Sequence, residues 1–158
     1  MPKTAAMRPT LSEPVSVQNP ISKLPVGKPL NILLVEDIKV NQALALKMLS
    51  VLGYSADTAK NGRHCLEMVK TKEYDLIFMD LYMPEMDGFY ASQEIRQMSK
   101  HTPQFRQPYI CALTANVMPK DQEACWAAGM NDILTKPIRL EMMHAALLKA
   151  LDVIYPAA

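Results

Sequence analysis

This sequence of 158 residues has few cysteines and no long apolar run, the features that mark disulfide-rich, zinc-binding and membrane-spanning proteins. Its three cysteines, Cys65, Cys111 and Cys125, include no Cys-X-X-Cys pair, which argues against a disulfide framework and a zinc site. We expect three reduced, mostly buried thiols. No apolar run approaches the roughly 20 residues needed to cross a bilayer, and the N-terminus has no apolar signal core. These absences predict a cytoplasmic location and no membrane contact by this segment.

An excess of charge of one sign is also missing, because the net charge is +1. Residues 1–30 hold four basic residues and one acidic residue, whereas residues 31–158 hold thirteen and fifteen. A folded part with a slight acidic excess argues against nucleic acid as a partner. The five glycines form no Gly-rich phosphate loop, which argues against a nucleotide-binding site.

Proline is concentrated at one end of the chain. Residues 1–29 contain six of the twelve prolines, with polar residues between them and no sustained periodicity. Proline blocks helix formation, and such a segment buries too little apolar surface to offset the entropy of ordering. We therefore predict a disordered linker or tail at 1–29, one folded domain at 30–155 and a short C-terminal tail at 156–158. A linker of this kind indicates a segment of a longer chain.

Within the folded part, the pattern is a strand followed by a helix, five times. Short apolar runs predict the strands, helical spacing of apolar residues predicts the helices, and Gly and Pro separate them. This alternation predicts an α/β fold, in which helices cover both faces of a parallel sheet. The expected strands are 32–35, 54–59, 75–80, 109–113 and 133–134, and the expected helices are 40–52, 63–71, 89–98, 119–128 and 139–153.

Polar side chains stand at the carboxyl ends of four expected strands, where functional groups gather in open α/β sheets. Glu36 and Asp37 follow the first strand, and Asp80 ends the third. Thr114 ends the fourth, and Lys136 follows the fifth. The sequence thus predicts three carboxylates, one hydroxyl and one ammonium group at one edge of the sheet.

This combination has a chemical logic. Three neighbouring carboxylates raise one another's pKa values, and a hard divalent cation such as Mg²⁺ relieves the repulsion while leaving positions for phosphate oxygens. A carboxylate can itself be the nucleophile that forms an acyl phosphate. Lys136 supplies a mobile positive charge and Thr114 a hydrogen-bond donor for the phosphoryl oxygens.

The constellation resembles the response regulator receiver domain over about residues 30–153. The resemblance implies a flavodoxin-like three-layer (βα)5 sandwich with strand order 2-1-3-4-5. It also implies a phosphoacceptor in a two-component His–Asp phosphorelay, most similar to receivers of hybrid histidine kinases, and we expect the C-terminal receiver of such a kinase. The matching segments are Leu-Leu-Val-Glu-Asp at 33–37, Met-Asp at 79–80, Met-Pro-Glu-Met-Asp-Gly at 83–88, Ala-Leu-Thr-Ala-Asn at 112–116, Ala-Gly-Met-Asn-Asp at 128–132 and Thr-Lys-Pro-Ile at 135–138.

The resemblance also assigns roles to residues. Asp80 would accept the phosphoryl group from a histidine kinase or a histidine phosphotransfer protein, with Thr114 and Lys136 as the other catalytic residues. The ligands of Mg²⁺ would be Asp37, Asp80, the backbone carbonyl of Tyr82 and, through water, Glu36. A cis Lys136–Pro137 bond is implied as well. The domain's own chemistry would be self-phosphorylation and autodephosphorylation.

Two positions depart from the family pattern. Receivers usually carry Tyr or Phe three residues before the lysine, where this chain has Ile133, so a standard aromatic switch is not expected. Tyr82 stands two residues after the phosphoacceptor, where the family's side chain overhangs the site. A phenol there predicts slow hydrolysis of the acyl phosphate.

Two other functions are open on the sequence. A degenerate receiver would dock partners without phosphorylation, and Ile133 is its one support. A phosphatase with an aspartate nucleophile needs a second Asp two residues on, where Tyr82 stands. His64, His101 and His144 fall on helices or in the loop after the third helix, and none is placed as a phosphodonor. Trp126 suits either the core or an exposed partner face, and the oligomeric state is open.

Overall fold

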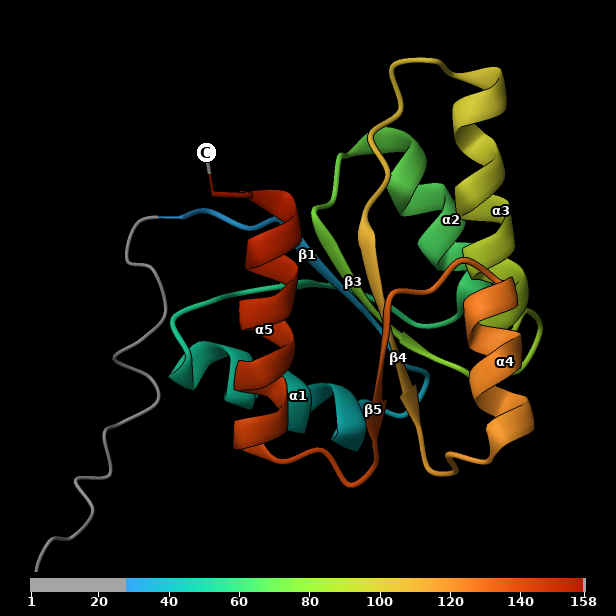
Figure 1. Ribbon diagram of the computed structural model, residues 1–158. Coiled ribbons are helices and arrows are strands. Elements are labelled where there is room, and N and C mark those ends of the chain that lie inside the picture. Colours follow the sequence, from blue (N-terminus) through green and yellow to red (C-terminus); the bar gives the residue numbers. More distant parts are fainter. Residues whose placement is uncertain (1–27, 158) are drawn as a thin grey trace, which may run out of the picture.

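The computed structural model describes residues 28–157, so most of the predicted linker at 1–29 lies outside the described residues. Five strands alternate with five helices, as the sequence predicts (Figure 1). The strands are β1 (Ile32–Val35), β2 (Asp57–Ala59), β3 (Leu76–Asp80), β4 (Tyr109–Thr114) and β5 (Asp132–Thr135). The helices are α1 (Lys39–Val51), α2 (Gly62–Thr71), α3 (Gly88–His101), α4 (Pro119–Ala127) and α5 (Leu140–Ile154).

All five strands are parallel and lie in the order β2-β1-β3-β4-β5, which confirms the flavodoxin-like topology. The central strands β1, β3 and β4 are buried along their whole length. Their apolar runs are continuous because both faces of a parallel sheet are covered by helices. The order changes direction at β1 and β3, so the carboxyl ends of these two strands flank the switch point of the sheet.

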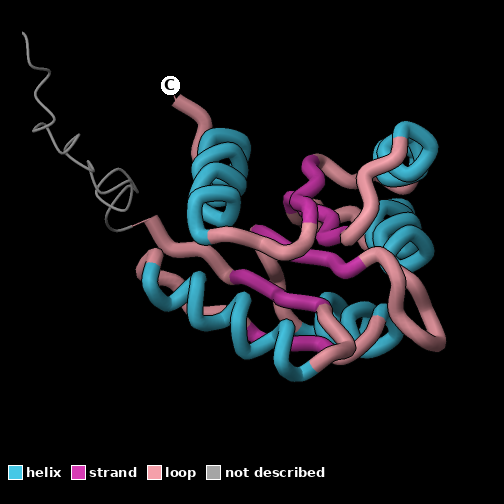
Figure 2. The backbone as a smooth tube through the Cα atoms, turned by 90° about the horizontal axis from the view of Figure 1, so that it is seen from below, coloured by secondary structure: helices cyan, strands magenta, loops and turns pink. Residues whose placement is uncertain are grey.

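The sheet lies between two layers of helices (Figure 2), and successive strand residues enter two separate cores. Ile32 and Leu34 pack in the core formed with α1 and α5, while Leu33 and Val35 pack in the core formed with α2, α3 and α4. This is the period-two alternation of a strand. The sheet is the middle of three layers, and helices pack against both of its faces.

Local signals set where helices begin and end. Gly53 follows α1 with φ +92°, a left-handed conformation that suits glycine at a helix C-terminus. Asn61 and Asp87 cap α2 and α3 by accepting the backbone N–H groups of His64 and Tyr90. The capping role of Asp87 was not predicted from the sequence.

The structure corrects some expected boundaries. Strand β2 is half the expected length, because only Asp57–Ala59 pairs with β1. Helix α3 continues to His101, three residues beyond the prediction, with polar residues on its outer side. His144 of α5 is buried, and Trp126 of α4 is 50% exposed, which places Trp126 outside the core. All three cysteines are free and buried, as expected. No helix among residues 28–157 is long and apolar enough to cross a membrane.

Candidate functional site

Three carboxylates meet at the carboxyl ends of β1 and β3. Ligand atoms of Glu36, Asp37 and Asp80 all lie within 4.8 Å of one another. Asp80 is the last residue of β3 and is 5% exposed, and Glu36 directly follows β1 and is 2% exposed. Parallel neighbouring strands bring their carboxyl ends to one edge, so the predicted cluster is present.

Lys136 enters this cluster from the segment after β5. Its Nζ lies 2.9 Å from Oε2 of Glu36 and 3.3 Å from Oδ1 of Asp80. The pairing with Asp80 was expected, whereas the closer contact with Glu36 was not. The Lys136–Pro137 peptide is cis, as the resemblance implies. The backbone N–H of Lys136 donates to the Thr114 carbonyl at 2.7 Å, which extends the β4–β5 pairing and fixes where the lysine side chain starts.

The environment changes the acid–base properties of the pair. Burial and the neighbouring charge of Glu36 raise the pKa of Asp80 to about 7, against the opposing effect of Lys136. Burial alone would lower the pKa of Lys136, but the hydrogen bond to Glu36 and the charge of Asp80 raise it on balance. The ammonium group is therefore retained at neutral pH, while Asp80 exchanges its proton within the physiological range.

Asp37 has one carboxylate oxygen that could accept a hydrogen bond or bind a cation but makes no hydrogen bond within residues 28–157. Its Oδ1 is buried and has no hydrogen-bond partner among the described residues. A buried carboxylate oxygen without a partner is costly, because it has lost its water and gained nothing in return. An oxygen-preferring divalent cation between Asp37 and Asp80 would supply the missing interaction, so this donor set fits Mg²⁺ chemistry.

Thr114 is in place at the end of β4, but its hydroxyl is engaged elsewhere. The Oγ1 donates to the Asn116 carbonyl at 2.9 Å and accepts the Asn116 N–H at 3.1 Å. The hydroxyl thus closes a local turn of the β4–α4 loop. To donate to a group on Asp80, it must first leave the Asn116 carbonyl.

The β3–α3 loop folds back against the strand end that carries Asp80. The N–H of Gly88 donates to the Leu81 carbonyl at 2.9 Å. A Cβ at Gly88 would lie 2.3 Å from the Asp80 carbonyl oxygen, so only glycine permits this approach of α3 to β3. In the same loop Glu85 has φ +70° and accepts a hydrogen bond from the Asn61 side chain. The loop geometry is therefore tied to both α2 and α3.

The Tyr82 side chain points toward α4. Its hydroxyl donates to Oδ1 of Asp121 at 3.1 Å, and its ring packs edge-on against Phe89, with centroids 5.9 Å apart. The residue is 58% exposed. Nothing in the sequence pattern indicated the contact with Asp121, because the two residues are 39 positions apart.

Comparison with known proteins identifies the family. The response regulator receiver domain profile matches residues 32–148. The chain belongs to this family. The receiver resembles segments of hybrid kinases: it is 39% identical over 124 residues to hybrid signal transduction histidine kinase K of Dictyostelium discoideum. It is 42% identical over 123 residues to the aerobic respiration control sensor protein ArcB of Escherichia coli. These alignments cover 77% and 78% of this chain but only 10% and 15% of the relatives.

Solved receiver structures share the fold. One is the receiver of Saccharomyces cerevisiae Ssk1, crystallised with the histidine phosphotransfer protein Ypd1, with a TM-score of 0.69 and 33% identity over 78% of this chain and 87% of that one. Another is the receiver of a Pseudomonas aeruginosa sensor histidine kinase with magnesium in its active-site cleft, with a TM-score of 0.65 and 35% identity over 82% of this chain and 100% of that one. The present chain is thus a receiver domain of the His–Asp phosphorelay type, and these relatives lend no support to a docking module that is not phosphorylated.

The raised pKa of Asp80 predicts how stability depends on pH. The folded state binds the Asp80 proton more tightly than the unfolded chain does, so the free energy of unfolding falls as pH rises from about 4 to about 7. With divalent cations removed, Asp80→Asn should be more stable than the parent at pH 8, by on the order of 2 kcal/mol, and nearly equal to it at pH 4. Urea unfolding at both pH values measures this difference.

Asp57 provides a control, because its pKa is shifted in the direction opposite to that of Asp80. Hydrogen bonds from Lys72 and Tyr74 lower the pKa of Asp57, so Asp57→Asn should lose stability at pH 8. If the difference in stability between Asp80→Asn and the parent is the same at pH 8 as at pH 4, the Asp80 carboxylate does not destabilise the folded state.

Proposed function

We propose that Asp80 is the phosphoacceptor of this receiver domain and that Mg²⁺ binds beside it. The observation that carries the proposal is the position of Asp80: its Oδ1 lies 3.3 Å from the Lys136 ammonium, inside a cluster of three carboxylates. One oxygen of the Asp80 carboxylate would form the new bond to phosphorus as the bond between phosphorus and the donor imidazole nitrogen breaks. The imidazole would keep the electron pair, and Asp80 would become an acyl phosphate.

The residues around Asp80 would divide the remaining work. Asp37, Asp80 and the Tyr82 backbone carbonyl would hold the metal, with Glu36 acting through water. When bound, Mg²⁺ supplies positive charge to the phosphoryl oxygens. Lys136 would shift from Glu36 toward the phosphoryl group, and Thr114 would give up its bond to Asn116 to donate to another phosphoryl oxygen. Attack of water on phosphorus would later regenerate the Asp80 carboxylate.

The phosphoryl donor would be a histidine kinase or a histidine phosphotransfer protein. No histidine lies in the carboxylate cluster within residues 28–157, so the donor imidazole must come from a partner. Exposed apolar side chains of Ile38, Val40 and Leu44 line the start of α1, next to the cluster. We infer that a partner helix carrying the donor histidine docks on this face. The cytoplasmic location and a place at the C-terminal end of a hybrid kinase stay predictions.

Mass spectrometry after incubation with acetyl phosphate and Mg²⁺ tests the assignment. The parent should gain the mass of one phosphoryl group, and the gain should vanish in Asp80→Asn. As a second donor, a phosphorylated histidine phosphotransfer protein should transfer its phosphoryl group to the parent. Val40→Glu should slow transfer from the protein donor at least tenfold and leave the reaction with acetyl phosphate unchanged, since only the former needs a docked helix.

If no gain occurs with either donor, or if an equal gain occurs in Asp80→Asn, Asp80 is not the phosphoacceptor. Asp87→Asn is a matched control, because Asp87 caps α3 outside the cluster and its replacement should leave the gain of one phosphoryl group intact.

A further inference from the structure

The packing of α4 leaves this helix weakly attached along its length. Of its nine residues, only Cys125 is buried. Trp126 is 50% exposed, and Met118 just before the helix is 54% exposed. A helix with so small a buried face gains little stability from its middle. Its position is therefore set mainly by what holds its two ends.

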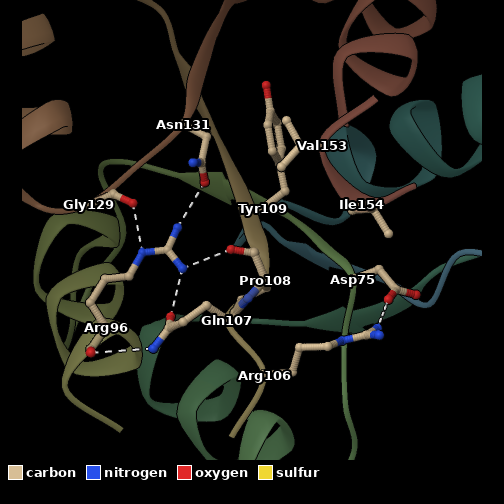
Figure 3. A pocket seen from close by; sticks show the side chains of 10 residues that line it. All are labelled: Asp75, Arg96, Arg106, Gln107, Pro108, Tyr109, Gly129, Asn131, Val153 and Ile154. Carbon is tan, nitrogen blue, oxygen red and sulfur yellow. Dashed lines mark hydrogen bonds and ion pairs between the residues drawn. The ribbon is translucent and has the colours of Figure 1, made fainter. Parts of the chain in front are cut away.

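The C-terminal end of α4 is held firmly by Arg96 of α3 (Figure 3). The Arg96 guanidinium donates to the Gly129 carbonyl through Nε, to the Pro108 carbonyl through Nη1 and to Oδ1 of Asn131 through Nη2, each at 2.8 Å. Gly129 has φ +89°, and a Cβ there would lie 2.6 Å from Cγ of Arg96. Several charge-assisted bonds and close packing thus fix this end to α3 and to the segments before β4 and β5.

The N-terminal end of α4 has one polar tie to the loop that follows Asp80. Among the described residues, the hydrogen bond from Tyr82 to Asp121, at 3.1 Å, is the only one that joins a side chain of the 81–87 loop to α4. Asp121 lies in the first turn of the helix. Phe89 supports the Tyr82 ring from its edge, so the phenol is aimed at Asp121. A single bond near solvent can be broken far more easily than the Arg96 network.

We propose that Tyr82 and Asp121 are positioning residues that clasp the N-terminal end of α4 to the phosphoacceptor loop, while Arg96 holds the other end as a pivot. The clasp gives this receiver a connection between Asp80 and α4 that does not need an aromatic ring at Ile133. Its coupling to phosphorylation rests on the function proposed for Asp80. The clasp itself is a property of the unphosphorylated domain and is tested there.

The covalent path from the site to α4 shows how the clasp would open. Because Thr114 Oγ1 both donates to the Asn116 carbonyl and accepts the Asn116 N–H, a hydroxyl that turns toward a phosphoryl oxygen would release the β4–α4 loop from these two bonds. That loop ends at Met118, whose carbonyl accepts the N–H groups of Asp121 and Gln122. A displacement of Met118 would therefore carry Asp121 with it and would break the hydrogen bond to Tyr82. Helix α4 would then swing about its Arg96-bound end.

Hydrogen exchange of the unphosphorylated full chain tests the clasp. Tyr82→Phe removes only the hydroxyl and keeps the ring against Phe89. It should raise amide exchange at residues 121–124 by about fivefold, the effect of losing one hydrogen bond, and leave residues 129–133 unchanged. Asp121→Ala should do the same, and the double variant should exchange no faster than either single variant. Asp121→Asn keeps an acceptor oxygen and should restore near-parental exchange.

Tyr90→Phe is the matched control, because Tyr90 is an exposed tyrosine of α3 whose hydroxyl has no hydrogen bond to the described residues. The proposal is overturned if Tyr82→Phe exchanges like Tyr90→Phe at residues 121–124. It is also overturned if exchange rises equally in the central strands, since that would indicate general loosening of the fold. In the phosphorylated parent, exchange at 121–124 should rise to the level of Tyr82→Phe, and an unchanged rate would refute the coupling. Absence of a phosphoryl mass gain would instead refute the function of Asp80 and leave the result on the unphosphorylated clasp intact.

Discussion

Lys136→Met should lower the free energy of unfolding by about 3–5 kcal/mol at pH 8 without divalent cations. Methionine keeps an unbranched apolar side chain close to the lysine stem in size but removes the ammonium group. Glu36 is 2% exposed and Asp80 is 5% exposed, so neither carboxylate can replace the lost partner with bulk water. Removing one partner of a buried ion pair is strongly destabilising because the other charge stays buried and unpaired. A loss of this size is a large share of the stability of a small domain.

Urea unfolding of the variant and the parent at pH 8 measures the loss. Lys149→Met is the control. The Lys149 Nζ lies 3.9 Å from Oδ1 of Asp132, and the lysine side chain is 66% exposed. An ion pair with so exposed a lysine contributes little to the free energy of unfolding. Adding Glu36→Gln to Lys136→Met should recover much of the lost stability, because the carboxylate closest to the lysine is then neutral. If Lys136→Met is as stable as Lys149→Met, the ion pairs with Glu36 and Asp80 do not support the fold.

The parallel sheet with helices on both faces could be predicted because it depends on local patterns, whereas the strand order was implied by the family resemblance. Continuous apolar runs of four residues at 32–35 and 76–79 are typical of strands that are covered on both faces, and the structure confirms that both strands are buried. Parallel strands that end in polar residues then bring Glu36, Asp37 and Asp80 together without any knowledge of side-chain conformation. Residue order and strand direction are enough to place these groups at one edge.

What could not be predicted depends on rotamers and on contacts between distant segments. Lys136 can reach two carboxylates, and its closer approach to Glu36 follows from backbone positions that the pattern does not contain. Thr114 was expected to face the phosphoacceptor, but its hydroxyl also fits the local turn at Asn116. The contact of Tyr82 with Asp121 needs the relative placement of a loop and a helix. Such contacts decide how the site communicates, whereas the pattern decides only where it lies.

The site combines two forms of stored electrostatic energy. Burial and the charge of Glu36 raise the pKa of Asp80, and Oδ1 of Asp37 has no partner among the described residues. Both features favour added positive charge over the cation-free state. The same features that destabilise the domain should therefore make it bind a divalent cation, and the affinity should depend most on Asp37.

Asp37→Asn should weaken Mg²⁺ binding by at least tenfold, and calorimetric titration at pH 8 measures it. Asparagine keeps the shape of the side chain but removes the charge that a hard cation requires. In the parent, Mg²⁺ at about 100 times its dissociation constant should add about 2.7 kcal/mol to the free energy of unfolding, and Asp37→Asn should lose most of that gain. Asp87→Asn, which changes a carboxylate outside the cluster, should bind Mg²⁺ like the parent. Equal affinities in Asp37→Asn and Asp87→Asn would show that the buried oxygen of Asp37 does not hold the cation. The phosphoryl transfer proposed for Asp80 would then need another source of positive charge besides Lys136.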